Sequence, residues 1–161
     1  MIYIIIPLLC IVTFFLWAAI HELSHLFAAK KLADALLIRM RLYPHMYKDT
    51  LRFASVSWRP RKEYSDKAAA MISLAPRIPD LIAALVFPVG AFFSGYVAVA
   101  WFILFGAGLV DLMRGSIGSS VYSDLMKASI KLHINPWTLR YAGFGAALLS
   151  TTSYFILRFA V

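Results

Sequence analysis

Long apolar runs separated by shorter polar stretches dominate the pattern of this chain. No charged residue occurs from Met1 to Ile20, and a run of that length can cross the hydrocarbon core of a bilayer as a helix. No basic residue precedes this run, and it is longer than the apolar core of a signal peptide, so we interpret it as a membrane helix that continues through Ala29. The runs predict an all-α polytopic membrane protein with about four spans, at 2–20, 68–87, 91–110 and 139–160.

The second of these spans is the least regular. It contains Pro76, Arg77, Pro79 and Asp80, and a charge at membrane depth is costly and usually paired or functional. Arg77 and Asp80 are three residues apart and can pair on one face of a helix. In an alternative arrangement, 68–80 lies at the membrane interface and 81–110 forms one long span.

A small β-hairpin is predicted between the first two spans. The segments 36–43 and 51–58 partly alternate apolar and polar residues and are rich in strand formers, with 44–50 as their connection. A lone two-stranded hairpin is marginal in water, so this one needs support from the membrane surface or the helices.

Composition and charge agree with a membrane protein. Hydrophobic residues make up 61% of the 161 residues, whereas soluble domains carry roughly 45–50%. Ten of the 16 Lys and Arg residues lie between 30 and 67, which predicts by the positive-inside rule that this loop is cytoplasmic. Four spans then place 111–138 on the same side and both termini outside. We therefore expect one multi-pass domain, 1–161, in the cell membrane, with the lipid bilayer and not nucleic acid as the partner of the basic segment.

Residues 21–25 read His-Glu-Leu-Ser-His and carry the chemistry that the sequence predicts. Positions four apart share a helix face, so His21 and His25 can bind one metal ion. Zn²⁺ lowers the pKa of a bound water toward about 7, and a neighbouring glutamate takes its proton as the water attacks a carbonyl. Two His ligands flanking such a glutamate are the signature of zinc hydrolases, which predicts a Zn²⁺ site with Glu22 as general base.

A catalytic zinc ion needs a third protein ligand and an open position. The candidates in this chain are Asp80, Asp111, Asp124, His45 and His133. His21 lies about 19 residues into the first span and Asp111 about 20 into the third, so a rise of about 1.5 Å per residue brings both near the inner face. Asp124 follows the predicted helix break at 115–120, and Ser123 before it is a predicted N-cap for a helix over 125–132.

Two segments of the chain resemble motifs of site-2-protease-like intramembrane metalloproteases. These are the His-Glu-Leu-Ser-His motif and Tyr122-Ser-Asp-Leu-Met-Lys127, which is similar to the family's distal Asp segment about two helices later. The resemblance implies cleavage of membrane-embedded or membrane-proximal peptides, with Asp124 as third ligand and Asp111 as the alternative. Ser24 and Leu125 stand where the family commonly has glycine, and its Asn-x-x-Pro element is absent because Asn135 is the only Asn.

We therefore expect a zinc-dependent intramembrane endopeptidase whose active site lies near the cytoplasmic face and whose substrate is a membrane protein or peptide. The strand at 51–58 is predicted to hold that substrate extended by pairing with its backbone. A non-enzymatic module, such as a small transporter or a pseudo-protease, is the main alternative, and the Arg77 and Asp80 charges are its best support. A haem-binding bundle is a weaker alternative. Haem held between helices needs histidines on two facing spans, whereas His21 and His25 are on one helix. Small residues at Gly143 and Ala147 predict a helix-packing face on the last span.

Overall fold

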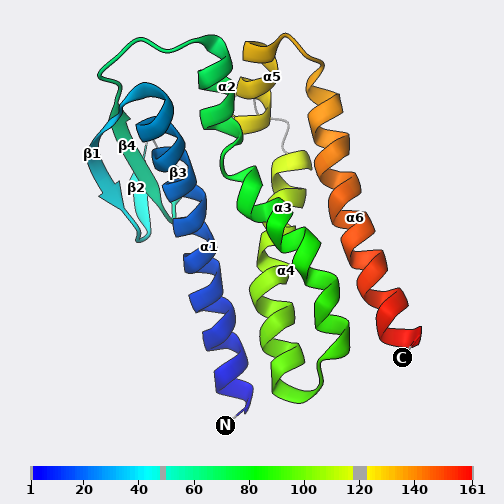
Figure 1. Cartoon of the computed structure of the whole chain (residues 1–161). Helices are drawn as coiled ribbons and strands as arrows, with labels where there is room; N and C mark the ends of the chain where they lie inside the picture. Colours follow the sequence, from blue (N-terminus) through cyan, green and yellow to red (C-terminus); the bar gives the residue numbers. More distant parts are fainter. Residues whose placement is uncertain (1, 48–49, 118–122, 161) are drawn as a thin grey trace.

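The computed structural model describes residues 2–47, 50–117 and 123–160 and shows a mainly helical molecule with a small β-structure (Figure 1). In chain order its elements are α1 (Ile2–Ala33), β1 (Leu36–Arg41), β2 (His45–Tyr47), β3 (Thr50–Arg52), β4 (Ser55–Arg59), α2 (Asp66–Leu74), α3 (Arg77–Val86), η1 (Phe87–Phe92), α4 (Gly95–Ile117), α5 (Asp124–Leu132) and α6 (Pro136–Ala160).

The long helices run up and down through the molecule. Helix α1 begins at the end of the molecule where α6 finishes, and the strands, α2 and α5 gather at the opposite end (Figure 1). Helix α3 descends from α2 to the 3₁₀ helix η1, where the chain reverses and α4 ascends. This path carries His21 on α1 and Asp111 on α4 toward the same end of the molecule.

The span predicted at 68–87 is not one continuous helix, because the structure has two helices there that together can form a single bent span. Helices α2 and α3 meet at a bend of 43°. Pro76 lies in this bend, where a proline cannot donate the backbone hydrogen bond that would continue α2. The alternative span at 81–110 is wrong, since η1 separates α3 from α4 and Gly95 opens α4 with a φ of 56°.

Two helices, α1 and α4, are long and apolar enough to cross a membrane, and α2, α3 and η1 add a third if the bent pair is one span. Helix α6 has 25 residues but does not reach the same apolarity. Its polar residues include Arg140, Arg158 and the Ser-Thr-Thr-Ser run at 150–153. By length and composition, the described helices therefore account for two or three of the four predicted spans.

The predicted hairpin is confirmed, with an additional pair of short strands at its tip. Strands β1 and β4 pair antiparallel, with Met40 opposite Val56, and β2 pairs with β3 in the same sense. The predicted connection at 44–50 contains β2 and the start of β3, and 48–49 lie outside the described residues. Phe53, between β3 and β4, contacts the rings of Phe14 and Phe15, so the sheet lies along α1.

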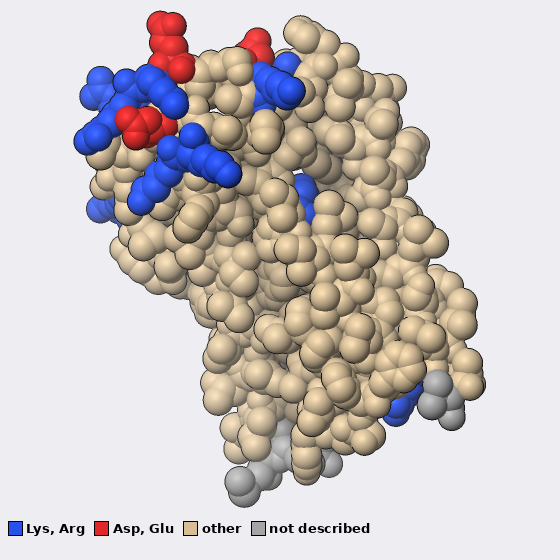
Figure 2. Space-filling model, in the orientation of Figure 1, with Lys and Arg blue, Asp and Glu red and all other residues tan. Residues whose placement is uncertain are grey.

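The interior is built from small residues, whereas many large apolar side chains face outward. Eleven of the seventeen apolar residues that are buried in the described chain are alanines, whereas Leu85 and Phe159 are 79% and 85% exposed. Small residues let helices approach closely in a membrane, where the surrounding solvent is itself apolar. Lys and Arg side chains gather at the end that carries the hairpin, and most of the remaining visible surface is uncharged (Figure 2).

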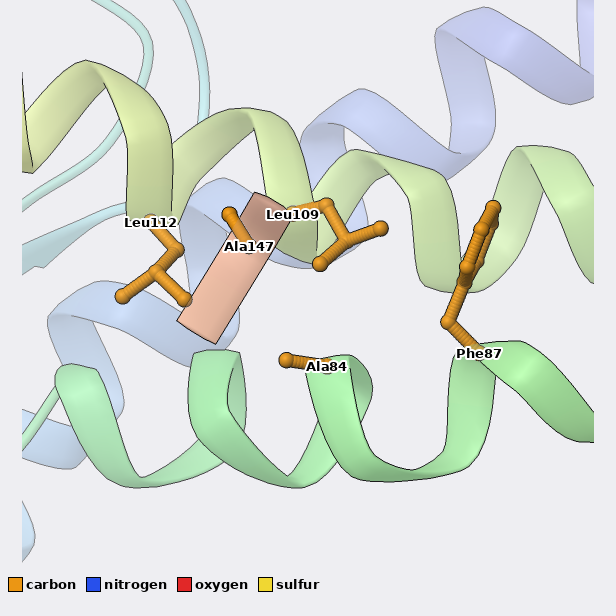
Figure 3. Packing of buried hydrophobic residues seen from close by; sticks show 5 residues of the cluster. All are labelled: Ala84, Phe87, Leu109, Leu112 and Ala147. Atoms are coloured by element: carbon orange, nitrogen blue, oxygen red, sulfur yellow. The ribbon is translucent and has the colours of Figure 1, made fainter. Parts of the chain in front are cut away.

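A compact cluster holds α3, η1, α4 and α6 together. It consists of Ala84, Phe87, Leu109, Leu112 and Ala147, whose side chains meet between the helices (Figure 3). The predicted small-residue face of α6 is confirmed, because a side chain at Gly143 would meet Ser116 and Ala147 is completely buried. Burial of Leu112 against these helices fixes the rotation of α4 and thereby the direction of the adjacent Asp111.

Candidate metal centre

Both histidines of the first helix direct their Nε2 atoms at one carboxylate oxygen. The Nε2 atoms of His21 and His25 each lie 3.3 Å from Oδ2 of Asp124. Helix α1 supplies both rings from successive turns, whereas Asp124 opens α5, so 99 residues separate His25 from its acidic partner. The three side chains are half-buried, and one ligand atom from each falls within a group that spans at most 4.8 Å.

The two histidine-to-Asp124 distances are compatible with a tetrahedral metal site. Zn–N and Zn–O bonds are about 2.0–2.2 Å, so two ligands at the tetrahedral angle lie about 3.3–3.5 Å apart. Both histidine-to-Asp124 distances have that value. Two imidazoles and a carboxylate are also a ligand set that zinc takes in catalytic sites, with the fourth position open. The residues therefore fit a divalent metal ion such as Zn²⁺.

The other ring nitrogen of each histidine is occupied by a partner on a different helix. Nδ1 of His21 lies 2.9 Å from Oδ2 of Asp111 on α4, and Nδ1 of His25 lies 2.8 Å from the carbonyl oxygen of Ile72 on α2. Both partners accept hydrogen bonds, so they favour the tautomer with the proton on Nδ1 and leave Nε2 free to bind a metal. Histidine ligands in metalloproteins are commonly oriented in this way.

Asp124 is held by the start of its own helix. The hydroxyl of Ser123 accepts a hydrogen bond from the Met126 N–H, which makes Ser123 the N-cap as predicted. Lys127 lies one turn on, with Nζ 3.6 Å from Oδ1 of Asp124. Burial alone would raise the pKa of the Asp124 carboxyl, but its contacts with the His21 and His25 rings hold that pKa well below its usual range. Asp124 is therefore ionised, as a metal ligand must be.

Glu22 faces the β-structure as well as the site. Its Oε2 accepts a hydrogen bond from the backbone N–H of Val56 on β4, at 3.0 Å. Glu22 also lines a cavity of about 940 Å³ together with His21, Asp111 and Asp124. The carboxylate is thus outside the group of three ligand atoms but open to the same space.

Most of the cavity wall is apolar. Helices α1 and α4 provide two sides of it, and the described lining residues include Phe14, Trp17, Phe53, Phe102 and Val110. A hydrogen bond links these two helices, because the Trp17 indole N–H on α1 donates to the carbonyl oxygen of Leu104 on α4 at 2.6 Å. The His21 and Asp124 side chains line the same cavity.

The remaining candidates for the third metal ligand do not join the three ligand atoms. His45 bonds the Tyr43 carbonyl and the Ser55 hydroxyl within the hairpin, and His133 ends α5 in a left-handed conformation. Asp80 pairs with Arg77, as their spacing predicts, and not with the histidines. Helix α4 continues through 115–117 of the predicted break, while its remainder at 118–120 and Tyr122 of the distal segment lie outside the described residues.

Sequence reasoning missed the groups that hold the ligands in place. These are the Ile72 carbonyl, the Val56 N–H and the carboxylate of Asp111 in its contact with Nδ1 of His21. Two of them are backbone groups, which carry no signature in a sequence. For Asp111, its shared depth with His21 was the available signal.

Comparison of the chain with protein-family models, with curated proteins and with solved structures finds no match.

Proposed function

We propose that this protein is a zinc-dependent intramembrane endopeptidase. One observation carries the proposal: two Nε2 atoms and a carboxylate oxygen converge at tetrahedral spacing, and both Nδ1 atoms are held by acceptors on other helices. A pair of histidines that served only to cap or pack a helix would not need a shared carboxylate and two fixed tautomers. His21, His25 and Asp124 are the proposed ligands.

The proposed chemistry is hydrolysis of a peptide bond. Zn²⁺, when bound, lowers the pKa of a water molecule and polarises a carbonyl. Glu22 is the proposed general base, because its carboxylate opens onto the same cavity and is outside the ligand set. Asp111 orients the His21 ring and the Ile72 carbonyl orients the His25 ring, and the apolar walls of α1 and α4 limit access of bulk water.

The proposed topology has four membrane passes, formed by α1, the bent α2–α3 unit, α4 and α6. The basic end with the hairpin, α2 and α5 then faces the cytoplasm of the cell, and both termini lie outside. The charge distribution supports this orientation, since Lys and Arg concentrate at that end (Figure 2). The active site lies near the cytoplasmic boundary of the bilayer.

The proposed substrate is a membrane-embedded or membrane-proximal peptide, held extended beside β4. Val56 pairs with Met40 of β1 in the ladder, yet its N–H points to Glu22. The outer edge of β4 therefore faces the proposed catalytic centre. A peptide backbone added at this edge lies next to Glu22, which supports the assignment of the strand edge to substrate binding.

The proposal is tested with purified protein in liposomes and a set of quenched-fluorescent peptides, both unstructured and single-span. We expect cleavage that a zinc chelator stops and added Zn²⁺ restores, and that His25→Ala abolishes. His133→Asn is the matched histidine control, because Asn also tolerates the left-handed conformation at this position and His133 does not belong to the group of three candidate ligands. Wild-type protein that binds zinc but cleaves none of the peptides would instead indicate a non-enzymatic module, such as a transporter or a pseudo-protease.

A further inference from the structure

A buried ion pair contacts Asp111, the residue whose carboxylate holds the His21 ring of the proposed metal centre. Asp80 is 1% exposed and Arg77 is 9% exposed, and the Arg77 Nη1 donates to Asp80 Oδ2 at 2.8 Å. Taking two charges out of water costs several kcal/mol per ion, and an apolar pair of similar volume often stabilises a protein as well or better. Such a pair in an apolar helix therefore calls for a role beyond folding.

The same guanidinium also contacts Asp111. Arg77 Nη1 donates to the Asp111 carbonyl oxygen at 2.9 Å and lies 3.8 Å from its carboxylate Oδ2. That Oδ2 is the atom that accepts from Nδ1 of His21. A continuous series of contacts thus runs from Asp80 through Arg77 and Asp111 to His21, and it joins α3, α4 and α1.

Helix α4 is shaped to admit the guanidinium at this point. Gly115 follows Asp111 by one turn, and a Cβ at Gly115 would lie 2.6 Å from the Arg77 Cζ and Nη1 and 2.7 Å from its Nη2. Any other residue at 115 would push the guanidinium away from Asp111. The close approach therefore depends on a glycine, and the atoms that would move are the far end of a flexible side chain and not backbone.

We propose that Arg77 is a positioning residue for the metal centre. It fixes the backbone and carboxylate of Asp111 so that Asp111 orients the His21 ring and aims its Nε2 at the metal, while Asp80 holds the guanidinium in place. This inference rests on the proposed function, because it assigns a role toward the same metal site. Groups that orient metal ligands typically contribute about 10–100-fold to metal affinity or activity.

The test measures the zinc dissociation constant, by competition with a chromophoric chelator, and the visible spectrum of the Co²⁺-loaded protein. The first variant is Gly115→Ala, with Gly106→Ala as its control on the same helix, because a Cβ at Gly106 meets only Phe87 at an ordinary 3.7 Å. We expect about tenfold weaker zinc binding and a changed Co²⁺ spectrum for Gly115→Ala, and wild-type values for Gly106→Ala.

A second variant separates positioning from folding. Arg77→Met with Asp80→Val replaces both charges by apolar side chains, so its thermal unfolding stays close to wild type if the pair has no other structural duty. We expect this folded double variant also to bind zinc about tenfold more weakly. Wild-type zinc affinity and Co²⁺ spectra in both folded variants would overturn the positioning role. Failure of the wild-type protein itself to bind zinc would overturn the proposed function, which distinguishes the two outcomes.

Discussion

Replacement of Glu22 by Gln removes the proposed base and little else. The Glu22 Oε2 accepts one hydrogen bond from the Val56 N–H, at 3.0 Å, and the amide oxygen of Gln can accept the same bond. A bond to a charged acceptor contributes about 1.5–3 kcal/mol and a neutral one about 0.5–1.5 kcal/mol, so the free energy of unfolding should fall by about 1 kcal/mol. Glu22 is outside the three-ligand group, and zinc content should stay at the wild-type level.

The effect on catalysis should be much larger than the effect on stability. General acid–base catalysis contributes typically about 10²–10⁴-fold, which corresponds to about 2.7–5.5 kcal/mol in the activation barrier. The assay is single-turnover cleavage of a peptide in liposomes, with zinc measured on the same samples. Glu63→Gln is the matched control, since Glu63 is the only other glutamate and is exposed between β4 and α2. It should cleave at the wild-type rate.

Two results would refute this reasoning about Glu22. Loss of zinc to the level of His21→Ala would make Glu22 a ligand instead of a base. Cleavage within about threefold of wild type would place the base on another residue, because the expected loss from removing a base is at least about 10²-fold.

Three further predictions concern topology, the strand edge and the α5 cap. Single cysteines at Lys62 and Ala160, in a Cys10→Ser background, should react with an impermeant maleimide from opposite sides of the membrane, and labelling from one side would contradict the four-pass arrangement. Ala54→Pro removes a backbone N–H beside the cavity and leaves the Val56 bond to Glu22 in place, so it should reduce cleavage while zinc binding persists, whereas Ala54→Ser should cleave normally; equal rates in both would exclude the edge as a substrate site. Ser123→Ala removes the α5 cap and should lower the free energy of unfolding by about 1 kcal/mol in thermal or denaturant unfolding, and an unchanged stability would show that the cap is dispensable.

The elements of this fold with strong periodic signals could be predicted from the sequence. The uncharged run before His21 gave α1, and the alternation around Val56 gave the paired strands. The break between α2 and α3 could not be placed, because a proline in a membrane helix can either kink it or end it, and the neighbouring helices decide. Helix α6 shows the converse, since its length and position were predicted closely but its polar residues weaken it as a span.

The candidate site, too, could be predicted only in part. The spacing of His21 and His25 predicted that both rings share one helix face, and the structure places both beside the Asp124 carboxylate. The partner of that pair depends on how α4 and α5 pack, so the sequence predicted Asp124 as third ligand and left Asp111 as the alternative. Only the tertiary structure shows that the Asp124 carboxylate lies at the Nε2 atoms and the Asp111 carboxylate at Nδ1 of His21. For the same reason, the buried pair of Arg77 and Asp80 was recognisable as an ion pair but not as a neighbour of the ligands.

Zinc stoichiometry with X-ray absorption spectroscopy on the purified protein tests most directly whether His21, His25 and Asp124 hold one zinc ion. We expect one zinc per chain with nitrogen and oxygen neighbours at about 2.0–2.2 Å. Zinc should be lost in Asp124→Ala, whereas Asp111→Ala should retain it with about 10–100-fold weaker affinity. Protein without zinc, or zinc that survives Asp124→Ala and disappears in Asp111→Ala, would contradict the account.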